Sequence, residues 1–377
     1  MIVIFPHYKS SGGAGKYISN IINRLLEHDM EFIVAGVYAK CYQKSHKKKS
    51  IIFKLILYFF SLLSYPSYDG VSFRAKLYYL TLLPVKFTIS ILLYFLCYLF
   101  CFNFIKSKKF TFVLTSSIQI PILIFSLLNN NLRFVVIIQE NLIFRGWLGR
   151  VLIYLLNKSY LTVSISSDWY DYAKMNGVFN LEYVPNTYSC PDDKCFGPEL
   201  LYDCIYVGGG QNIKGFYYLC EEIKRIKDGK YVFCLLGDYS PSQVRMVADI
   251  SLNSKCIDVF ILGCVDSIYP YLYNSKLLLL PITHAHFCRP AIEAGLCGRT
   301  FLVSDLSGLD DFAIDDFNCK KFPLIDGGLS NSIKDLLNNE ESITNLSHNN
   351  HGFAMNSLRL AELATEDFVK SLGNSIK

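Results

Sequence analysis

The sequence lacks the patterns by which metal sites and secreted disulfide proteins are usually recognised. Its 13 cysteines are irregularly spaced and odd in number, and neither a Cys-x-x-Cys nor a His-x3-His pair occurs. Irregular spacing favours free thiols in a reducing cytosol, and the missing pairs argue against a zinc site. The first residues, MIVIFPHY, also lack the basic start and long apolar core of a signal peptide. We therefore expect a cytoplasmic protein without a bound metal or other cofactor.

Charge is also sparse. Only 18% of the residues are charged, the net charge is +5, and the 37 lysines and arginines are spread along the chain instead of forming one stripe. This distribution argues against nucleic acid as a partner. The G-x-G-x-x-G fingerprint of dinucleotide binding is absent as well, which argues against a nicotinamide oxidoreductase. No internal repeat or low-complexity segment is present.

Apolar residues, in contrast, are abundant. They make up 51% of the 377 residues, and a chain of this length is expected to form two domains. Short apolar runs alternate with helical patterns, which predicts an α/β protein with two doubly wound, Rossmann-like domains. The expected strands are Ile2–Phe5, Phe110–Thr115, Phe134–Ile138, Leu161–Ser164 and Leu181–Val184, then Asp203–Val207, Tyr231–Leu236, Val259–Leu262, Lys276–Leu280 and Phe301–Ser304.

The most apolar part of the chain, residues 51–105, follows the basic run QKSHKKKS at 43–50. Residues 87–105 carry no charge and are long enough to span a bilayer. One crossing would, however, put strands of one sheet on opposite sides of the membrane. We expect helices that lie in the membrane interface and are attracted to anionic lipid. Core helices of the first domain are the alternative.

The most informative stretch of the chain is residues 281–298, PITHAHFCRPAIEAGLCG. Pro281 closes an apolar strand, and Pro290 is placed to start a helix with Glu293 in its first turn. This puts a carboxylate at the carboxyl edge of a sheet, where doubly wound folds bind ligands. Such a carboxylate is suited to accept hydrogen bonds from hydroxyl groups.

The stretch resembles the donor-site signature of retaining family-4 glycosyltransferases of the GT-B architecture. There, two glutamates eight positions apart bracket a Phe-Gly turn, and Glu-Ala-Met-Ala-Cys-Gly follows. The matching residues are Phe287, Pro290, Glu293, Ala294, Cys297 and Gly298. Ala285 replaces the first glutamate, and Cys288 replaces the glycine. The resemblance implies that Glu293 binds the nucleotide ribose, and His284 is a candidate to replace the missing glutamate near the transferred sugar. The alternative is that His284 and His286 are solvated loop residues.

Further elements resemble the family in order and spacing. Gly208, Gly209 and Gly210 follow a strand and precede Lys214, so that loop amides and an ammonium are expected to hold a diphosphate. Gly209 stands where the family has an arginine. The other matching positions are Gly12 and Gly13 before the first helix, Pro185-Asn186, Gly237-Asp238, Gly263, and Asp310 or Asp311. A glycine pair before a helix is as often simple turn chemistry.

On the acceptor side, the strand ending at Ile138 continues into Gln139, Glu140 and Asn141. Polar groups at that edge are candidates to contact an acceptor, and Glu140 is as readily explained as a helix cap. Arg145 and Arg150 either reach a phosphate or face solvent.

The expected layout is an acceptor-side domain at 1–187, a linker at 188–200, a nucleotide-sugar domain at 201–350 with a cleft between the two, and a C-terminal helix at 351–377 returning to the first domain. The expected function is retaining transfer of a sugar from a nucleotide diphosphate donor to a glycan or lipid-linked acceptor, in bacterial surface polysaccharide synthesis at the cytoplasmic side of the membrane. A non-catalytic partner of another transferase and a nucleotide-sugar epimerase are the alternatives.

Overall fold

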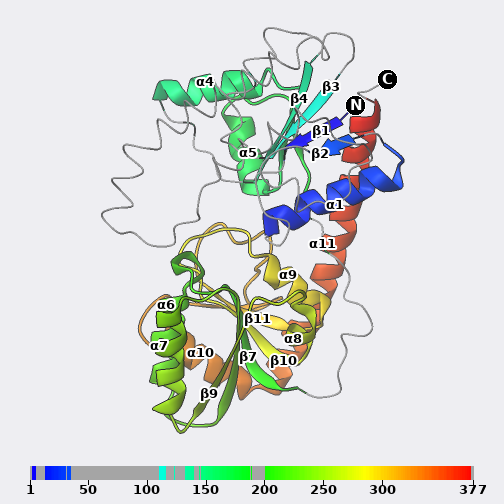
Figure 1. Ribbon diagram of the computed structural model, residues 1–377. Helices are drawn as coiled ribbons and strands as arrows, with labels where there is room; N and C mark the ends of the chain where they lie inside the picture. The colour runs from blue at the N-terminus through cyan, green and yellow to red at the C-terminus, as the bar shows by residue number, and fades with distance from the viewer. Residues whose placement is uncertain are drawn as a thin grey trace. The chain divides into compact units, whose positions relative to one another are not determined.

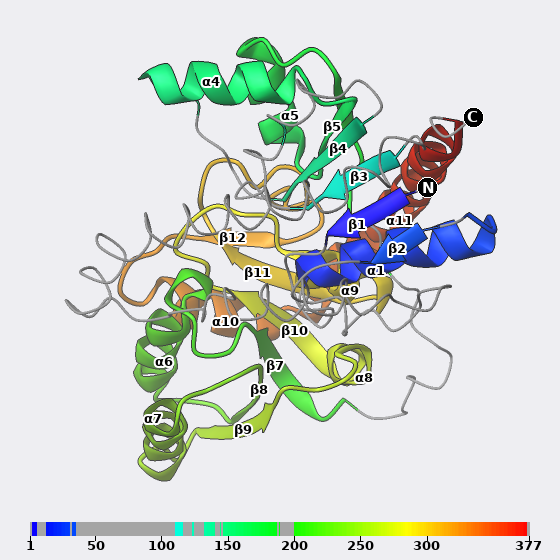
Figure 2. The ribbon, with the colours of Figure 1, turned by 45° about the horizontal axis from the view of Figure 1, so that its top comes forward.

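The computed structural model describes residues 2–5, 13–30, 32–34, 110–115, 123, 132–139, 144, 146–186, 188 and 200–374. The chain divides into two compact units, the first formed by Met1–Thr187 together with Leu360–Lys377, and the second by Tyr188–Arg359. Figures 1 and 2 label their helices and strands.

The first unit contains a six-stranded parallel sheet with the order β2-β1-β3-β4-β5-β6. The strands are β1 (Ile2–Phe5), β2 (Phe32–Val34), β3 (Phe110–Leu114), β4 (Leu132–Ile138), β5 (Leu161–Ser164) and β6 (Leu181–Tyr183). The described helices are α1 (Gly13–Glu27), α4 (Gly146–Leu156), α5 (Ser167–Met175) and the end of α11 (Glu340–Asn374). The order reverses between β1 and β3, as in a doubly wound fold.

Alternating side chains of this sheet build two cores. Val135 and Ile137 of β4 pack with α1 and with Phe368 and Leu372 of α11, whereas Val136 and its neighbours on the other face pack with α4 and α5. Both faces are covered because side chains alternate along a strand, and a strand buried on both sides reads as one continuous apolar run. Figure 1 shows the helices on the two faces of the sheet.

Helix α5 is capped by its own sequence at both ends. The side chain of Ser166 caps the helix by accepting a hydrogen bond from the backbone N–H of Trp169. Gly177 then ends the segment with a φ of 89°, a conformation that glycine adopts without steric cost.

The second unit contains a six-stranded parallel sheet with the order β12-β11-β10-β7-β8-β9. The strands are β7 (Tyr202–Val207), β8 (Tyr231–Leu236), β9 (Ile257–Gly263), β10 (Ser275–Leu280), β11 (Thr300–Ser304) and β12 (Lys320–Phe322). The helices are the 3-10 helix η4 (Asn212–Lys214), α6 (Phe216–Arg225), α7 (Pro241–Leu252), α8 (Tyr269–Tyr273), α9 (Arg289–Leu296), α10 (Gly328–Leu337) and the first part of α11.

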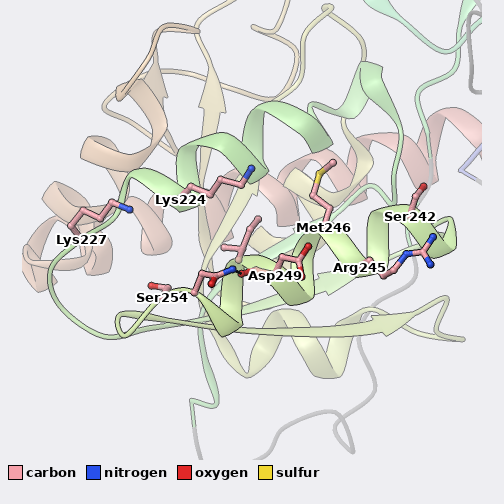
Figure 3. A pocket seen from close by; sticks show the side chains of 9 residues that line it. Lys224, Lys227, Ser242, Arg245, Met246, Asp249 and Ser254 are labelled. Atoms are coloured by element: carbon pink, nitrogen blue, oxygen red, sulfur yellow. Dashed lines mark hydrogen bonds between the residues drawn. The ribbon is translucent and has the colours of Figure 1, made fainter.

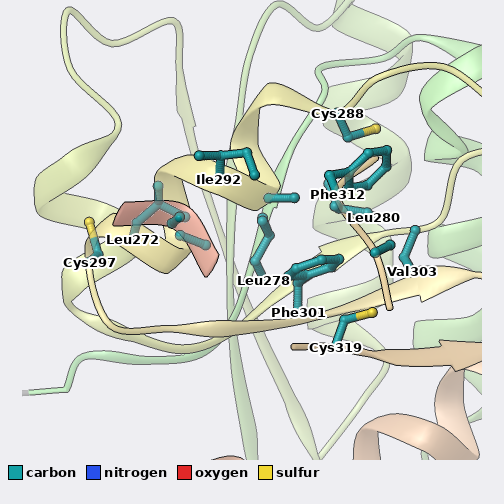
Figure 4. Packing of buried hydrophobic residues seen from close by; sticks show 14 of the residues in the cluster. Leu272, Leu278, Leu280, Cys288, Ile292, Cys297, Phe301, Val303, Phe312 and Cys319 are labelled. Carbon is teal, nitrogen blue, oxygen red and sulfur yellow. The ribbon is translucent and has the colours of Figure 1, made fainter. Parts of the chain in front are cut away.

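This sheet is also buried on both faces. Leu278 and Leu280 of β10 pack with α8, α9 and α11, together with Phe301 and Phe312, as Figure 4 shows. On the opposite face, Leu277 and other alternate residues pack with α6, α7 and α10. The expected fold class, α/β with two Rossmann-like domains, is thus confirmed.

The last helix is longer than expected, because it begins at Glu340 and not at residue 351. Its first turns contain asparagine, serine and histidine, which do not suggest a helix, yet Asn350 is fully buried and its side-chain nitrogen donates to the carbonyl oxygen of Arg299 at 2.7 Å. Tertiary contacts therefore outweigh weak helix propensity there.

Residues 43–50 and 51–105, for which interface helices were expected, lie outside the described residues. Within the part of the chain that the structure does describe, no helix combines the length and the apolar composition needed to cross a bilayer. The cysteines of the second unit's cores, among them Cys204, Cys234 and Cys319, are free thiols.

Candidate functional site

The topology of the second sheet places its switch point, a candidate ligand-binding edge, between β7 and β10. The chain passes from β7 outward to β8 and β9, then returns to β10 on the other side of β7. Loops that leave two neighbouring parallel strands in opposite directions open a crevice outside their carboxyl ends. The two loops here are residues 208–215, after β7, and residues 281–288, after β10.

The glycine loop after β7 folds back onto the end of β8. The amides of Gly208 and Gly209 donate to the carbonyl oxygen of Leu236 at 3.2 and 3.1 Å, and the amide of Gly210 donates to that of Asp238 at 2.9 Å. All three amides are therefore engaged inside the protein. The expected cradle of loop amides around a diphosphate is not formed in this conformation, because a hydrogen already donated to a carbonyl cannot serve a phosphate equally well.

Gly209 leaves no room for the arginine that the family has there. Its φ is +59°, and a Cβ at this position would lie 2.6 Å from the carbonyl oxygen of Asp238. Gly237 packs against the same loop, since its own Cβ would lie 2.4 Å from the amide nitrogen of Gly209. The positive charge of the family's arginine is thus absent here because the backbones of the loops after β7 and β8 pack too closely for a side chain at Gly209.

Lys214 is held between the two loops. It ends η4 and is followed by Gly215, whose φ of 79° turns the chain into α6. A Cβ on Gly215 would overlap the carbonyl oxygen of Pro281. Thr283 adds two bonds, from its amide to the carbonyl oxygen of Ile213 and from Oγ1 to that of Asn212, each 3.1 Å long. Helix α6 begins directly after Gly215, and the loops after β7 and β10 are joined to each other by these contacts.

His286 contacts Lys214 directly. Its Nε2 lies 2.5 Å from the Lys214 Nζ, and its Nδ1 lies 2.8 Å from the carbonyl oxygen of His284. Burial and the nearby Lys214 charge lower the pKa of His286 to about 4, so the ring is neutral near pH 7. From the sequence, His286 was expected only as a solvated loop residue. The signal that could have identified it is its place next to Ala285, the position at which the family has its first glutamate.

The neighbouring residues of this loop differ in exposure. His284 and Ala285 are exposed, and the His284 Nδ1 lies 3.0 Å from the Thr283 Oγ1. Phe287 instead packs its ring against Phe312 with centroids 5.5 Å apart. His284 therefore remains a candidate to contact a sugar, whereas part of the Phe287 ring is committed to the core.

Glu293 lies one turn further into α9 than expected. The helix begins at Arg289 and has no acidic residue in its first turn, so the expectation that Glu293 lies in the first turn is wrong. The side chain is 4% exposed, and its Oε1 accepts a 2.8 Å hydrogen bond from the Arg289 Nε. The Arg289 guanidinium in turn lies over the ring of Tyr188, 5.1 Å from its centroid. The carboxylate is thus paired inside the protein.

The remaining candidates of the second unit lie at the same sheet edge. The amide of Gly237 donates to the carbonyl oxygen of Gly263 at 2.8 Å, which ties the ends of β8 and β9 together. Asp311 is half-buried next to the core residue Phe312, and Asp310 is exposed and 3.4 Å from the Lys321 Nζ.

In the first unit, Gly13 is the first residue of α1, while Gly12, Glu140, Asn141 and Arg145 lie outside the described residues. Arg150 is exposed on α4. Gln139, at the end of β4, carries a side-chain oxygen and nitrogen that are buried and have no hydrogen-bond partner within the described ranges. A buried amide of this kind is available to a ligand.

A groove of about 620 Å³ lies elsewhere in the second unit, between α6 and α7. Figure 3 shows its lining, which includes Lys224, Lys227, Arg245 and Asp249. None of the expected site residues lines it. This groove is therefore separate from the candidate site at the sheet edge.

Comparisons with known proteins agree with this arrangement. Residues 202–339 match the family model of the glycosyl transferases group 1. A search of curated proteins found no match.

Solved structures match nearly the whole chain at low sequence identity. Anabaena Alr3699/HepE in complex with UDP-glucose has a TM-score of 0.64 at 13% identity, covering 98% of this chain and 99% of that one. A glycosyltransferase from Rickettsia africae has a TM-score of 0.67 at 12% identity, covering 98% and 97%. The sucrose-phosphate synthase of Thermosynechococcus elongatus has a TM-score of 0.66 at 14% identity, covering 99% of both chains.

At these identities the structural matches establish the fold, which is the two-domain GT-B fold expected from the sequence. The sequence match is confined to the second unit, which carries the sheet edge with Lys214, His286 and Glu293. Residues 202–339 accordingly resemble the glycosyl transferases group 1, and the chain as a whole has the GT-B fold.

Proposed function

We propose that the chain transfers a sugar from a nucleotide diphosphate sugar to a glycan or lipid-linked acceptor with retention of configuration. The observation that carries this proposal is the position of Lys214, half-buried at the switch point of the sheet in the unit that matches the family. An ammonium at this edge is suited to neutralise charge on a departing diphosphate, and oriented charge usually makes the largest contribution to such a step.

The donor class is supported by the structural neighbour that was solved with UDP-glucose. We assign Lys214 to the diphosphate, Glu293 to the ribose and His284 to the transferred sugar. Gly12, Gly13, Gly208, Gly209, Gly237, Gly263, Phe287 and Asp311 would line the donor site, and Glu140 and Asn141 the acceptor side. Glu293 must exchange its bond to Arg289 for ribose hydroxyls in order to take this part.

We further propose a role in bacterial surface polysaccharide synthesis, such as lipopolysaccharide assembly, at the inner face of the membrane. The basic run at 43–50 and the apolar stretch at 51–105 support attachment to anionic lipid.

A thermal-shift panel of nucleotide sugars tests the donor class, because a specific ligand raises the melting temperature by mass action. The ligand that binds is then incubated with the full chain and a bacterial lipid extract, and transfer of labelled sugar to lipid is measured. The anomeric configuration of the product, read by NMR, tests retention. Failure of every nucleotide sugar to shift the melting temperature would contradict the proposal.

A non-catalytic partner subunit is the second candidate. It is favoured by the pairing of Glu293 with Arg289 and by the absence of space for a charged side chain at Gly209. The same assay separates the two, since a partner subunit would bind a nucleotide sugar without transferring it, and transfer would appear only when a second protein is added.

A further inference from the structure

The contact between Lys214 and His286 joins two loops that leave neighbouring strands. Lys214 follows β7, and His286 follows β10. The two loops are already fixed to each other by the bonds of Thr283 and by the close approach of Gly215 to Pro281. The backbone contacts between the two loops therefore hold Lys214 and His286 close to each other.

The hydrogen bonds of His286 fix which of its ring nitrogens carries the proton. A carbonyl oxygen can only accept, so the Nδ1 facing the carbonyl oxygen of His284 at 2.8 Å must be the protonated nitrogen. In the neutral ring, Nε2 then carries a lone pair, and this lone pair faces the Lys214 Nζ at 2.5 Å. The lysine thus donates one of its three hydrogens to His286, and two remain for another acceptor.

We propose that His286 is a positioning residue that aims the Lys214 ammonium at the diphosphate of the donor. This inference rests on the proposed function, because it takes Lys214 to be the phosphate-binding group. A lysine on a flexible stem loses conformational entropy when it binds an anion. A fixed acceptor on one side removes part of that loss before the ligand arrives, which is preorganisation.

Two titratable groups contact the ring, Lys214 from η4 and Cys288 from its own loop. The imidazole of His284 adds a smaller electrostatic effect, which also lowers the pKa of His286. The Cys288 Sγ lies 3.5 Å from Nε2, and burial raises the pKa of its thiol to about 11, so that it adds no negative charge near pH 7. The surroundings favour the neutral imidazole, which is the form that accepts from an ammonium.

The test compares three substitutions of His286 in the full chain. His286→Leu removes the acceptor with little change in volume. His286→Gln can place an amide oxygen near the position of Nε2, and His286→Asn places it nearer to that of Nδ1. Titration calorimetry with UDP, GDP, ADP, CDP and dTDP identifies the tightest of the five for the wild type, and this nucleotide is used throughout.

We expect His286→Leu and His286→Asn to weaken binding about fivefold to tenfold, the effect of one lost hydrogen bond, and His286→Gln to restore most of the affinity. In a Lys214→Ala background, His286→Leu should have no further effect, because the two residues act through one contact. A merely structural role would predict equal losses in both backgrounds. Melting temperatures show whether each variant is folded. Should His286→Leu not fold, the comparison of His286→Gln with His286→Asn tests the positioning role by itself.

The outcomes separate this inference from the proposed function. Loss of affinity in Lys214→Ala together with unchanged affinity in His286→Leu overturns the positioning role alone. Unchanged affinity in Lys214→Ala, or no binding of any of the five nucleotides to the wild type, overturns the assignment of Lys214 and the positioning role with it.

Discussion

Arg289 and Glu293 lie one turn apart in α9 and are joined by a hydrogen bond of 2.8 Å between Nε and Oε1. Their side chains are 12% and 4% exposed. A carboxylate so deeply buried needs a partner, and removal of one member of such a pair leaves an uncompensated charge. Glu293 thus contributes to stability in addition to the binding role proposed for it, and its substitution must be interpreted with both effects in mind.

Glu293→Gln is expected to lower the free energy of unfolding by about 1–3 kcal/mol, because the charge-assisted bond from Arg289 becomes a weaker neutral one. Urea denaturation measures this change. Glu221→Gln is the matched control, since Glu221 forms an exposed pair with Lys224 at 2.7 Å and should change stability by less than about 1 kcal/mol. Equal effects of the two substitutions would show that burial of the Glu293 pair is not important.

Lys214→Ala is expected to weaken binding of a nucleoside diphosphate by about 1.5–3 kcal/mol, the range for a hydrogen bond to a charged group. Calorimetry measures the affinity directly. Lys224→Ala removes a lysine from the groove between α6 and α7 and should leave the affinity unchanged. A comparable loss in both variants would indicate that long-range charge, and not a contact, determines binding.

His284→Ala is expected to reduce sugar transfer at least tenfold, about 1.4 kcal/mol of barrier, with nucleotide binding almost unchanged. The exposed His284 can donate or accept near neutral pH, whereas Ala285 offers only backbone groups. Ala285→Glu in the same variant should recover part of the rate, because it restores the carboxylate of the resembled family. Full activity of His284→Ala would contradict the role given to this histidine.

Gly209→Ala is expected to destabilise the second unit by more than Gly263→Ala. Both glycines have positive φ, +59° and +71°, so both substitutions carry the same backbone strain of about 1–2 kcal/mol. Only Gly209 would also bring a Cβ to 2.6 Å from a backbone oxygen, whereas a Cβ at Gly263 meets nothing within 4 Å. Denaturation of the two variants gives the difference, and equal losses would show that the loops after β7 and β8 separate easily.

His286 is expected to make stability depend on pH. Its pKa is about 4 in the folded protein, against an ordinary value of 6.5, so the unfolded chain binds the proton more readily. The stabilisation by the neutral ring is present above about pH 6.5 and is lost as the pH falls towards 4. NMR titration of the ring should show this pKa, and Lys214→Met should raise it, because the lysine charge is one of its causes. An unchanged pKa in that variant would contradict the contact.

Much of the fold could be predicted from the pattern of apolar residues along the sequence. β8 was predicted with its observed ends, and Lys276–Leu280 lies within β10, because a parallel strand buried on both faces is a short unbroken apolar run. β12 was not predicted, since it has only three residues, two of them lysine, and is held by pairing with β11. The polar start of α11 was missed for the same reason, because contacts distant in sequence stabilise it.

Less of the candidate site than of the fold could be predicted from the sequence. The strand-loop-lysine order places Lys214, and the Pro290 signal gives the start of α9. The sequence does not show that the amides of the glycine loop donate to Leu236 and Asp238, because the spatial neighbours of a loop are set by the sheet order. The partner of Glu293 was missed although Arg289 is four residues away, a spacing that pairs side chains on a helix.

The final turns of α11 have a consequence for the order of events during synthesis. Phe368, Val369 and Leu372 are at most 1% exposed in a core whose other buried members all lie between residues 2 and 184. These residues are translated after the entire second unit. We therefore expect the first unit to emerge from the ribosome with the part of this apolar face that α1 does not cover still exposed to solvent, until the end of α11 has been made.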